Sequence, residues 1–569
     1  MNVEAGKPSC TASASPDSRG LDFYGSDPSL KGMLRIYLSD AERAHMEPHF
    51  ARLGRLVGGR LDDLAREADK TPPRLEPRTR QGEDRQSIVK APAYLAMERI
   101  AFGELALAAL SHRPALGWSS PLSAASKYAL TYLFAQSEFG LLCPVNMTDS
   151  LTRTIRRFAD DSLLARYLPG LLADDLAQQL QGAMFMTERW AGSDVGATET
   201  RAVRSGDHWL LYGDKWFCSN ADADLALVLA RPEGAASGTA GLGLFLMPRL
   251  LPTGAANSYR IVRLKDKLGT RAMASGEVVL AGAAAWLVGD LSQGFKQMAE
   301  MVNQSRLSNG VRSTGMMRRA VHEALTVALG RHAFGQRLIE LPLVRRQLIK
   351  MILSAEAALS MAFFTADCLE RADLGDRQAQ TLRRILTPLI KFRACRDARK
   401  VTGDAMEMRG GNGYIEEWIE PRLLRESHLG SIWEGTSNII ALDVVRAAGK
   451  TGAHRLLEAQ LRPMLAPAPS DLAAALGERL SAALALIERA GAEAAAARQA
   501  ASALYYATAA VLLVREAALL QDPGREDMAR LILSNKLAPR DPLAACAADD
   551  VRGEGIIRAL AAARRGEAA

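Results

Sequence analysis

Apolar residues recur every three or four positions along the first third of the chain. Met46, Phe50 and Leu53 share one face of a helix when they are placed at 3.6 residues per turn. The segment 127–142, KYALTYLFAQSEFGLL, continues the same spacing. The pattern predicts a helical domain over residues 31–181.

The spacing changes to short β-rich runs between about residues 184 and 288. Runs such as LALVLARPE and SGEVVLAGA are bounded by Gly, Asp, Asn and Pro, which is typical of strands joined by turns. They predict a small antiparallel barrel or sandwich over residues 182–288. Helical spacing then returns over residues 289–446. An Ala-rich helical extension over residues 447–569 opens with a proline-containing break, RPMLAPAPSD.

The first thirty residues are rich in Ser, Pro, Gly and Asp and lack helical or strand spacing. They predict a flexible or loosely draped leader over residues 1–30. The whole pattern therefore predicts a mainly α protein with a central β-barrel domain, flanked by a helical domain, a helical bundle and the C-terminal extension.

Composition and charge narrow the functional classes only slightly. The 569 residues carry 71 basic and 64 acidic side chains, a net charge of +7, which permits an anionic partner without requiring one. The six cysteines are scattered with no CxxC pair, so neither a disulfide framework nor a metal site is expected. The N-terminus lacks a secretory apolar segment, and the uncharged stretch between Arg498 and Arg515 is too polar for a span. We expect a cytoplasmic protein with no membrane segment.

Common catalytic and nucleotide motifs are missing. GLGLFL at 241–246 lacks the third glycine and the following helix of a dinucleotide loop. The chain contains no GxxxxGK[ST] loop and no GxSxG nucleophile turn. Phosphate-cleaving and serine hydrolase chemistry therefore have little support.

Five segments, in order along the chain, resemble the acyl-CoA dehydrogenase superfamily. They are MFMTERWAGSDVG (184–196), GDKWFCSN (213–220), KLGTRAMASGEVVL (267–280), RHAFGQRL (331–338) and MEMRGGNGYIEEWIEPRLLRESHLGSIWEGTSNII (406–440). The closest branch is the AidB-like one, on RLKDKLG, CPVNMT, Trp433 in IWEG and the long helical extension. The resemblance covers roughly residues 35 to 560.

The resemblance implies the acyl-CoA dehydrogenase fold, an FAD cofactor and an acyl-CoA or related thioester as substrate. Phe217 would cover the flavin in place of the family's Trp, Ser219 would contact its N5 edge, and Glu407 stands where the family has Gln. The full set of implied cofactor-binding residues is Met184, Met186, Thr187, Gly192, Ser193, Phe217, Ser219, Arg331, Phe334, Leu338, Glu407, Gly411, Thr436 and Asn438. Because the family uses the segment 331–338 on a neighbour's FAD, it also implies a homotetramer, or at least a dimer.

By the same resemblance, Glu434 is the catalytic base that removes the α-proton of the thioester. Some family members carry the base on an earlier helix, at the position that is Ser305 here, and serine cannot serve. Arg306 and Ser193 are the implied substrate-binding residues. The implied substrate is a short or branched acyl-CoA.

Two other functions stay open at this stage. The AidB-like branch is associated with DNA binding through its C-terminal helices, which would make the protein a flavin-containing DNA-binding protein of the alkylation response. From residue 445 onward the chain has only a slight basic excess, and DNA-binding proteins usually concentrate such charge. An oxidase or hydroxylase with the same fold is the third alternative. The sequence does not identify the electron acceptor.

Overall fold

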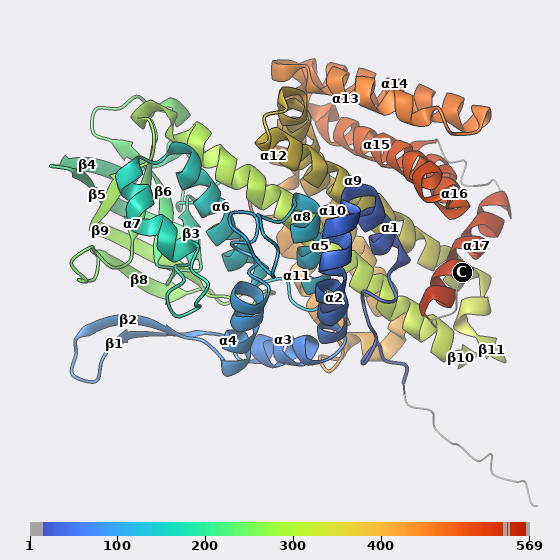
Figure 1. Ribbon diagram of the computed structural model, residues 1–569, viewed down its shortest axis with the longest axis horizontal. Helices are drawn as coiled ribbons and strands as arrows, with labels where there is room; N and C mark the ends of the chain where they lie inside the picture. Colours follow the sequence, from blue (N-terminus) through green and yellow to red (C-terminus); the bar gives the residue numbers. More distant parts are fainter. Residues whose placement is uncertain (1–14, 539–542, 544–546, 565–569) are drawn as a thin grey trace, which may run out of the picture.

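The computed structural model describes residues 15–538, 543 and 547–564. Figure 1 shows a β-domain on one side of a long helical bundle and a separate layer of C-terminal helices on the other. This confirms the predicted fold class, a mainly α protein with a central β-barrel domain.

The N-terminal helices pack through buried apolar residues against one another and against the bundle. Met46, Phe50 and Leu53, the stripe seen in the sequence, are fully buried. The helices are α1 (Pro28–Tyr37), α2 (Asp40–Val57), α3 (Arg60–Lys70), α4 (Pro92–Glu98), α5 (Ala124–Phe134), α6 (Leu142–Phe158) and α7 (Asp161–Leu171).

A hairpin of β1 (Arg74–Arg78) and β2 (Asp84–Val89) interrupts these helices and reaches toward the β-domain (Figure 1). Gln86 docks it: its side chain accepts from the backbone of Ile261 at 2.8 Å, and its carbonyl accepts from Arg249. The sequence pattern did not predict this hairpin.

The predicted leader is only partly described, since residues 1–14 lie outside the described residues. From residue 15 onward the structure differs from the prediction, because the segment is packed on the bundle. Phe23 and Asp27 are fully buried, and the Ser18 hydroxyl donates to Glu323. Helix α1 begins at Pro28, with the Asp27 carboxylate accepting from Leu30 N at 3.0 Å as its N-terminal cap. A few buried residues anchor this polar segment despite its composition.

The β-domain is a seven-stranded sheet that closes on itself. Its strands are β3 (Gly182–Phe185), β4 (Arg201–Ser205), β5 (His208–Ser219), β6 (Leu225–Pro232), β7 (Gly243–Pro248), β8 (Tyr259–Leu264) and β9 (Ser275–Leu287). The path β6–β4–β5–β9–β7 returns to β6 through the β6–β7 pairing, while β3 and β8 extend it at β6 and β9. Of the two predicted alternatives, barrel or sandwich, the sheet is the barrel.

Three long helices form the bundle that carries the candidate site. They are α8 (Gly294–Gly330), α9 (Pro342–Asp373) and α10 (Arg377–Arg409), followed by α11 (Glu420–Gly430) and α12 (Ser437–Thr451). The short strands β10 (His332–Ala333) and β11 (Gln336–Arg337) form a turn after α8. Helix α8 is buried over most of its 37 residues, so it runs through the middle of the molecule.

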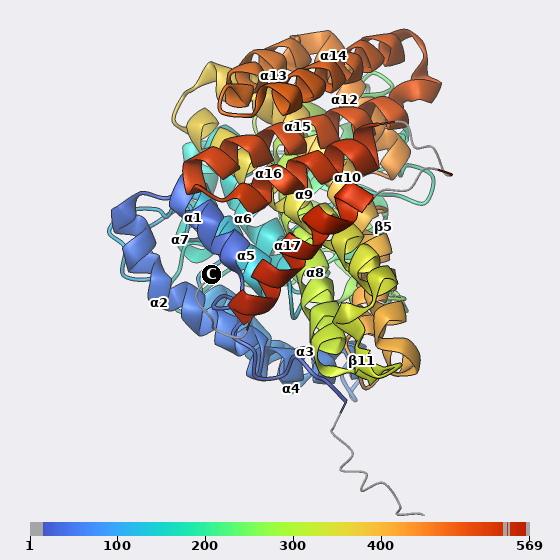
Figure 2. The same cartoon turned by 90° about the vertical axis from the view of Figure 1, so that its right-hand side faces the viewer.

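The C-terminal extension packs back onto this bundle. It contains α13 (Ala453–Leu461), α14 (Ser470–Ala492), α15 (Ala497–Leu520), α16 (Pro523–Ile532) and α17 (Ala547–Arg564). Figure 2 shows α17 crossing the bundle, where Arg564 donates to the carbonyl of His322 at 2.9 Å. Two described helical segments, Pro342–Asp373 and Ala494–Leu520, are long and apolar enough to cross a membrane by length and composition. Their apolar windows are 94% and 67% buried inside the protein, which accounts for that composition.

Candidate active site

Glu434 lies on the turn between α11 and α12, and two cations hold the backbone of this turn. Glu434 has φ 56° and Gly435 has φ 106°, both in the left-handed region. Arg306 Nε on α8 donates to the Glu434 carbonyl at 3.0 Å, and Lys391 Nζ on α10 donates to the Gly435 carbonyl at 2.6 Å. The two long helices therefore fix the position of the predicted base through its own backbone.

The two carboxylate oxygens of Glu434 have different surroundings. Ser305 is fully buried on α8, and its hydroxyl donates to Oε1 of Glu434. The other oxygen, Oε2, is buried and has no hydrogen-bond partner among the described residues. Ser305 occupies the position at which some family members carry the base. In this chain its hydroxyl instead donates a hydrogen bond to the Glu434 carboxylate. One oxygen is thus anchored and the other is left for a ligand.

Arg306 contacts the carboxylate of Asp443 in addition to the backbone of Glu434. Its Nη1 contacts Asp443 at 2.8 Å, and Arg384 contacts the same carboxylate at 2.5 Å. Burial would raise the pKa of Asp443, but these two guanidinium groups more than offset it and hold the pKa below its usual value. The predicted substrate-binding role of Arg306 stays a prediction, and the structure gives the side chain a positioning role toward Glu434.

Lys391 is a site residue that the sequence reasoning missed. Burial lowers its pKa to about 8, although the nearby Cys395 and Glu434 act in the opposite direction. The signal was a single lysine inside the apolar run LTPLIKF on α10. A lysine in such a run is either satisfied by a specific partner or functional, and here its partner is the turn that carries the base.

The β-domain contributes the second group of predicted residues. They lie on β3, on the loop that follows it and on β5: Met184, Met186, Thr187, Gly192, Ser193, Phe217 and Ser219. The Thr187 carbonyl accepts from Trp216 N at 2.8 Å, which ties the loop to β5.

The segment just before α6 lies beside the base. Phe139 stacks on Trp433, the residue before Glu434, with ring centroids 5.6 Å apart. Nearby at the start of α6, burial raises the pKa of the Cys143 thiol to about 11.

The residues present fit a flavin at the β-domain face. Phe217 is 57% exposed, an unusual degree for an aromatic side chain on a barrel strand, and it offers an apolar surface to stack on. A Cβ added at Gly192 would meet nothing within 4 Å, so the loop leaves room at this point. The hydroxyls of Thr187 and Ser219 can hydrogen-bond the polar edge of an isoalloxazine ring.

A third group of predicted residues lies at the other end of α8. It comprises Arg331, Phe334, Leu338, Glu407 and Gly411. Arg331 Nη1 donates to the carbonyl of Arg409 at 3.2 Å, next to the glycine turn 410–414. Phe334 is 92% exposed with φ 53°. From Ser305 to Gly330, α8 extends about 38 Å, so this group cannot contact the region around Glu434 in the same chain.

The last two predicted cofactor residues flank the start of α12. Thr436 is the N-cap residue of α12 but makes no side-chain cap hydrogen bond, and it is exposed. Asn438 is also exposed, and its side-chain oxygen accepts from Arg498 at 3.4 Å. Both side chains are accessible beside Glu434, as cofactor contacts would need to be.

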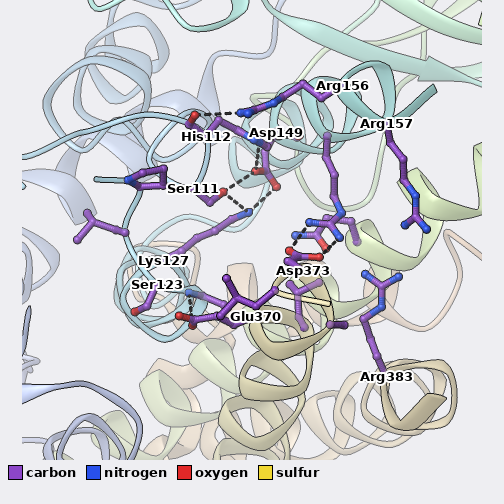
Figure 3. A pocket seen from close by; sticks show the side chains of 18 of the residues that line it. Ser111, His112, Ser123, Lys127, Asp149, Arg156, Arg157, Glu370, Asp373 and Arg383 are labelled. Carbon is purple, nitrogen blue, oxygen red and sulfur yellow. Dashed lines mark hydrogen bonds and ion pairs between the residues drawn. The ribbon is translucent and has the colours of Figure 1, made fainter. Parts of the chain in front are cut away.

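A separate polar cavity of about 610 Å³ lies between α5, α6, α9 and α10 (Figure 3). Several of its charges have ion-pair partners: Lys127 lies 2.5 Å from Asp149, and Arg383 lies 3.1 Å from the neighbouring Glu300. Gln304 lines the cavity, whereas the next residue on α8, Ser305, faces Glu434. Helix α8 therefore stands between this cavity and the base, and no predicted site residue lines it.

Comparison with known proteins identifies the family. Residues 292–449 match the acyl-CoA dehydrogenase C-terminal domain and residues 183–283 match its middle domain. The putative acyl-CoA dehydrogenase AidB of Escherichia coli is 36% identical over 446 residues, which cover 74% of this chain and 80% of that protein. The chain belongs to the acyl-CoA dehydrogenase family. Within the family it belongs to the AidB-like branch, because residues 14–176 match the N-terminal domain of adaptive response protein AidB.

Other acyl-CoA dehydrogenases agree in sequence and structure. Acyl-CoA dehydrogenase family member 11 of Caenorhabditis elegans is 31% identical over 439 residues, covering 74% of this chain and 70% of that protein. The crystal structure of C. elegans ACDH-11 in complex with C11-CoA superposes with a TM-score of 0.86 at 26% identity, over 95% of each chain. An acyl-CoA dehydrogenase from Bacillus anthracis complexed with FAD shares the fold, with a TM-score of 0.72 at 17% identity over 97% of this chain and 99% of that one.

Family membership establishes the enzyme class, an FAD-dependent acyl-CoA dehydrogenase. The individual site roles and DNA binding stay predictions. In the C-terminal extension, Arg455 and Arg462 form ion pairs with Glu458, and Arg455 also pairs with Glu488. These pairs reduce the positive charge that the extension could offer to a phosphate backbone.

Proposed function

We propose that the protein oxidises a short or branched acyl-CoA, with Glu434 as the base that removes the α-proton. The observation that carries this proposal is the division of the Glu434 carboxylate. Oε1 is anchored by Ser305, and Oε2 is buried and free of protein partners in the described chain. A base needs one oxygen oriented toward its proton, in a place from which water is largely excluded.

The backbone anchors support this role by limiting the movement of the base. Arg306 and Lys391 hold the turn from two different helices, so the carboxylate approaches the substrate from a fixed direction. FAD, when bound, supplies the acceptor for the hydride that leaves the β-carbon. The protein's own contribution is to hold the α-carbon against Glu434 Oε2, to receive the proton there and to exclude water.

Aromatic side chains beside the base favour a short acyl chain. Trp433 precedes Glu434, and its ring stacks on Phe139 with centroids 5.6 Å apart and planes 24° from parallel. We expect the stacked pair to limit the length of acyl chain that fits beside the carboxylate. The C. elegans relative crystallised with C11-CoA supports an acyl-CoA as the substrate class.

Anaerobic flavin bleaching tests the proposal directly. Purified wild-type protein and Glu434→Gln are mixed with a series of acyl-CoAs of increasing length and branching, and loss of flavin absorbance is followed. We expect fast bleaching by short or branched chains in the wild type and a loss of at least about 10³-fold in the variant, with FAD still bound. Equal bleaching by both proteins would reject Glu434 as the base.

We further propose that the enzyme works as an oligomer, at least a dimer, in which two subunits contribute residues to each FAD site. Arg331 and Phe334 are exposed at the far end of α8, about 38 Å of helix from Ser305. Their predicted role at an FAD is therefore compatible only with the cofactor of another subunit. The family resemblance implies a homotetramer.

A further inference from the structure

Buried arginines in the described chain follow a consistent rule. Arg409 pairs with Glu323, and Arg525 pairs with Glu516, each at 2.6 Å. Arg318, Arg319, Arg422 and Arg425 likewise have carboxylate partners. This is expected, because a buried charge without a partner is strongly destabilising.

Arg312 on α8 breaks this rule. Its side chain is fully buried, and no carboxylate lies within 4.0 Å of it in the part of the chain that the structure describes. Its Nε makes one long hydrogen bond, 3.4 Å, to the Ser308 carbonyl. Both terminal nitrogens, Nη1 and Nη2, have no partner. The Nη1–Nη2 edge of this buried guanidinium, which carries four N–H donors, is therefore unsatisfied.

The unsatisfied edge lies in the surroundings of the base. The guanidinium carbon is 4.9 Å from the ring centroid of Phe139 and 5.0 Å from that of Trp433, the residue before Glu434. Trp433 Nε1 and Glu434 Oε2 are also buried without partners. Several unsatisfied polar atoms thus gather around one place.

Helix geometry places Arg312 at a useful distance from the base. Ser305 and Arg312 are seven residues apart, so they lie on the same face of α8 and about 10 Å apart along its axis. Because helical side chains lean toward the N-terminus, the arginine reaches back toward Ser305 and the carboxylate that Ser305 anchors. A short acyl chain whose α-carbon lies at Glu434 would therefore extend toward Arg312.

We propose that the preferred substrate is an acyl-CoA whose short acyl chain ends in a carboxylate, and that Arg312 binds that carboxylate. This rests on the proposed dehydrogenase function and adds its substrate class. A carboxylate matches the guanidinium edge with two parallel hydrogen bonds and neutralises the buried charge. Phe139 and Trp433 contact the guanidinium through their rings, and neither ring satisfies its N–H donors, which are left to the substrate.

The arginines of the polar cavity differ from Arg312. Arg153 contacts Glu300 at 2.9 Å and Arg383 contacts the same carboxylate at 3.1 Å, so each has a carboxylate partner. Arg312 is the buried guanidinium for which the described protein provides no such group.

The test compares paired acyl-CoAs of similar length. Succinyl-CoA and glutaryl-CoA are set against butyryl-CoA and pentanoyl-CoA in anaerobic flavin bleaching, with wild type, Arg312→Met and Arg312→Lys. We expect the wild type to favour the carboxylated member of a pair by about tenfold or more, and Arg312→Met to reverse that preference. Arg312→Lys should keep part of this preference, because lysine retains the positive charge but cannot form the bidentate pair of hydrogen bonds. A wild-type preference for the uncarboxylated chains that Arg312→Met leaves unchanged would overturn the proposal.

A binding measurement separates this inference from the dehydrogenase function. If no acyl-CoA bleaches the flavin, the proposed function fails, and ligand-induced shifts of the unfolding midpoint still test Arg312. Glutaryl-CoA should then raise the midpoint more than pentanoyl-CoA in the wild type but not in Arg312→Met. Without ligand, Arg312→Met should unfold at a higher temperature than the wild type, because it removes an uncompensated buried charge. Equal shifts by both ligands in both proteins would reject Arg312 as a carboxylate-binding residue.

Discussion

Ser305 makes the one hydrogen bond that the structure gives to the Glu434 carboxylate. We expect Ser305→Ala to slow flavin reduction by about tenfold, because a hydrogen bond to a charged group is worth roughly 1.5–3 kcal/mol. Stopped-flow flavin bleaching measures this effect. Ser308→Ala, which changes another buried serine of α8, is the matched control, and equal behaviour of the two variants would contradict the role of Ser305.

Lys391 gives the stability of the protein a defined pH dependence. Burial lowers its pKa to about 8 from an ordinary value of 10.5, so between these pH values the unfolded chain binds the extra proton. The free energy of unfolding therefore gains a contribution that rises with pH across this window. Burial lowers the pKa of Lys267 to about 8 as well, and it acts in the same direction.

The prediction is that Lys391→Met flattens this rise. Urea unfolding at pH 8, 9 and 10 should show a smaller increase for Lys391→Met than for the wild type, with Lys267→Met giving a similar reduction and the double variant a larger one. The same slope in all four proteins would show that neither lysine is held with a lowered pKa. Lys391→Met should also slow flavin bleaching, because the Glu434 turn loses its anchor on α10.

At this scale the sequence pointed to the base, Arg306 and the Ser305 position, but not to Lys391 or Arg312. Glu434 was found through the IWEGTS motif, which is local in sequence. Lys391 and Arg312 come from two other helices, and no motif relates their positions to residue 434. Their only local signal was a positively charged residue inside a run of apolar or small residues. Most such buried cations in the described chain form ion pairs with a carboxylate, so the signal alone does not indicate a functional site.

At the scale of elements, Arg409 joins the N-terminal segment to the glycine turn after α10. It contacts Glu323 on α8 and Glu420 at the start of α11, and its Nη1 donates to the Pro16 carbonyl at 2.8 Å. Burial raises the pKa of Glu420 to about 7, the charge of Glu323 adds to this, and Arg409 opposes it. One guanidinium therefore keeps two buried carboxylates close together.

We expect Arg409→Met to destabilise the protein by about 3–5 kcal/mol near pH 8, because it leaves the buried Glu420 carboxylate unpaired and removes one of the two guanidinium partners of Glu323. Part of this loss should be recovered at pH 5. A carboxyl whose folded pKa is raised binds a proton more readily when folded, so folding is favoured as the pH falls through 7. Thermal unfolding at both pH values measures the recovery. Arg396→Met, on the same helix but outside this cluster, is the control, and a loss that does not change with pH would contradict the account.

The helices were predictable from periodicity, whereas the β1–β2 hairpin and the packed leader were not. The hairpin sequence is polar because it lies on the surface, and it is held by contacts with β8 that are 175 residues away in sequence. The leader likewise depends on a distant partner, Glu323. Long-range pairing of polar residues leaves no periodic signal in one sequence.

At the scale of the whole molecule, α8 connects two sites that serve different subunits in our proposal. Ser305 lies in its first half, and Arg331 directly follows its last residue. The order of a helical domain, a barrel and a bundle was predictable from the sequence, but this separation appears only once the length of α8 is known.

Subunit mixing tests the shared site. Arg331→Ala should lose FAD and Glu434→Gln should lose activity, each as a homo-oligomer. Refolding or co-expressing the two variants together should restore about a quarter of wild-type activity, because one site in each mixed pair combines an intact Glu434 with an intact Arg331. Complete absence of recovery, with mixed oligomers shown by mass spectrometry, would place Arg331 outside the neighbour's site.

The left-handed backbone conformation of Glu434 creates a trade-off between the stability of the fold and the activity of the enzyme. A non-glycine residue at φ 56° costs roughly 1–2 kcal/mol relative to a residue free to adopt that conformation. Glycine at this position would relieve that cost and abolish the base. A selection for thermal tolerance alone would therefore drift toward glycine here, and only a simultaneous demand for turnover would keep the glutamate.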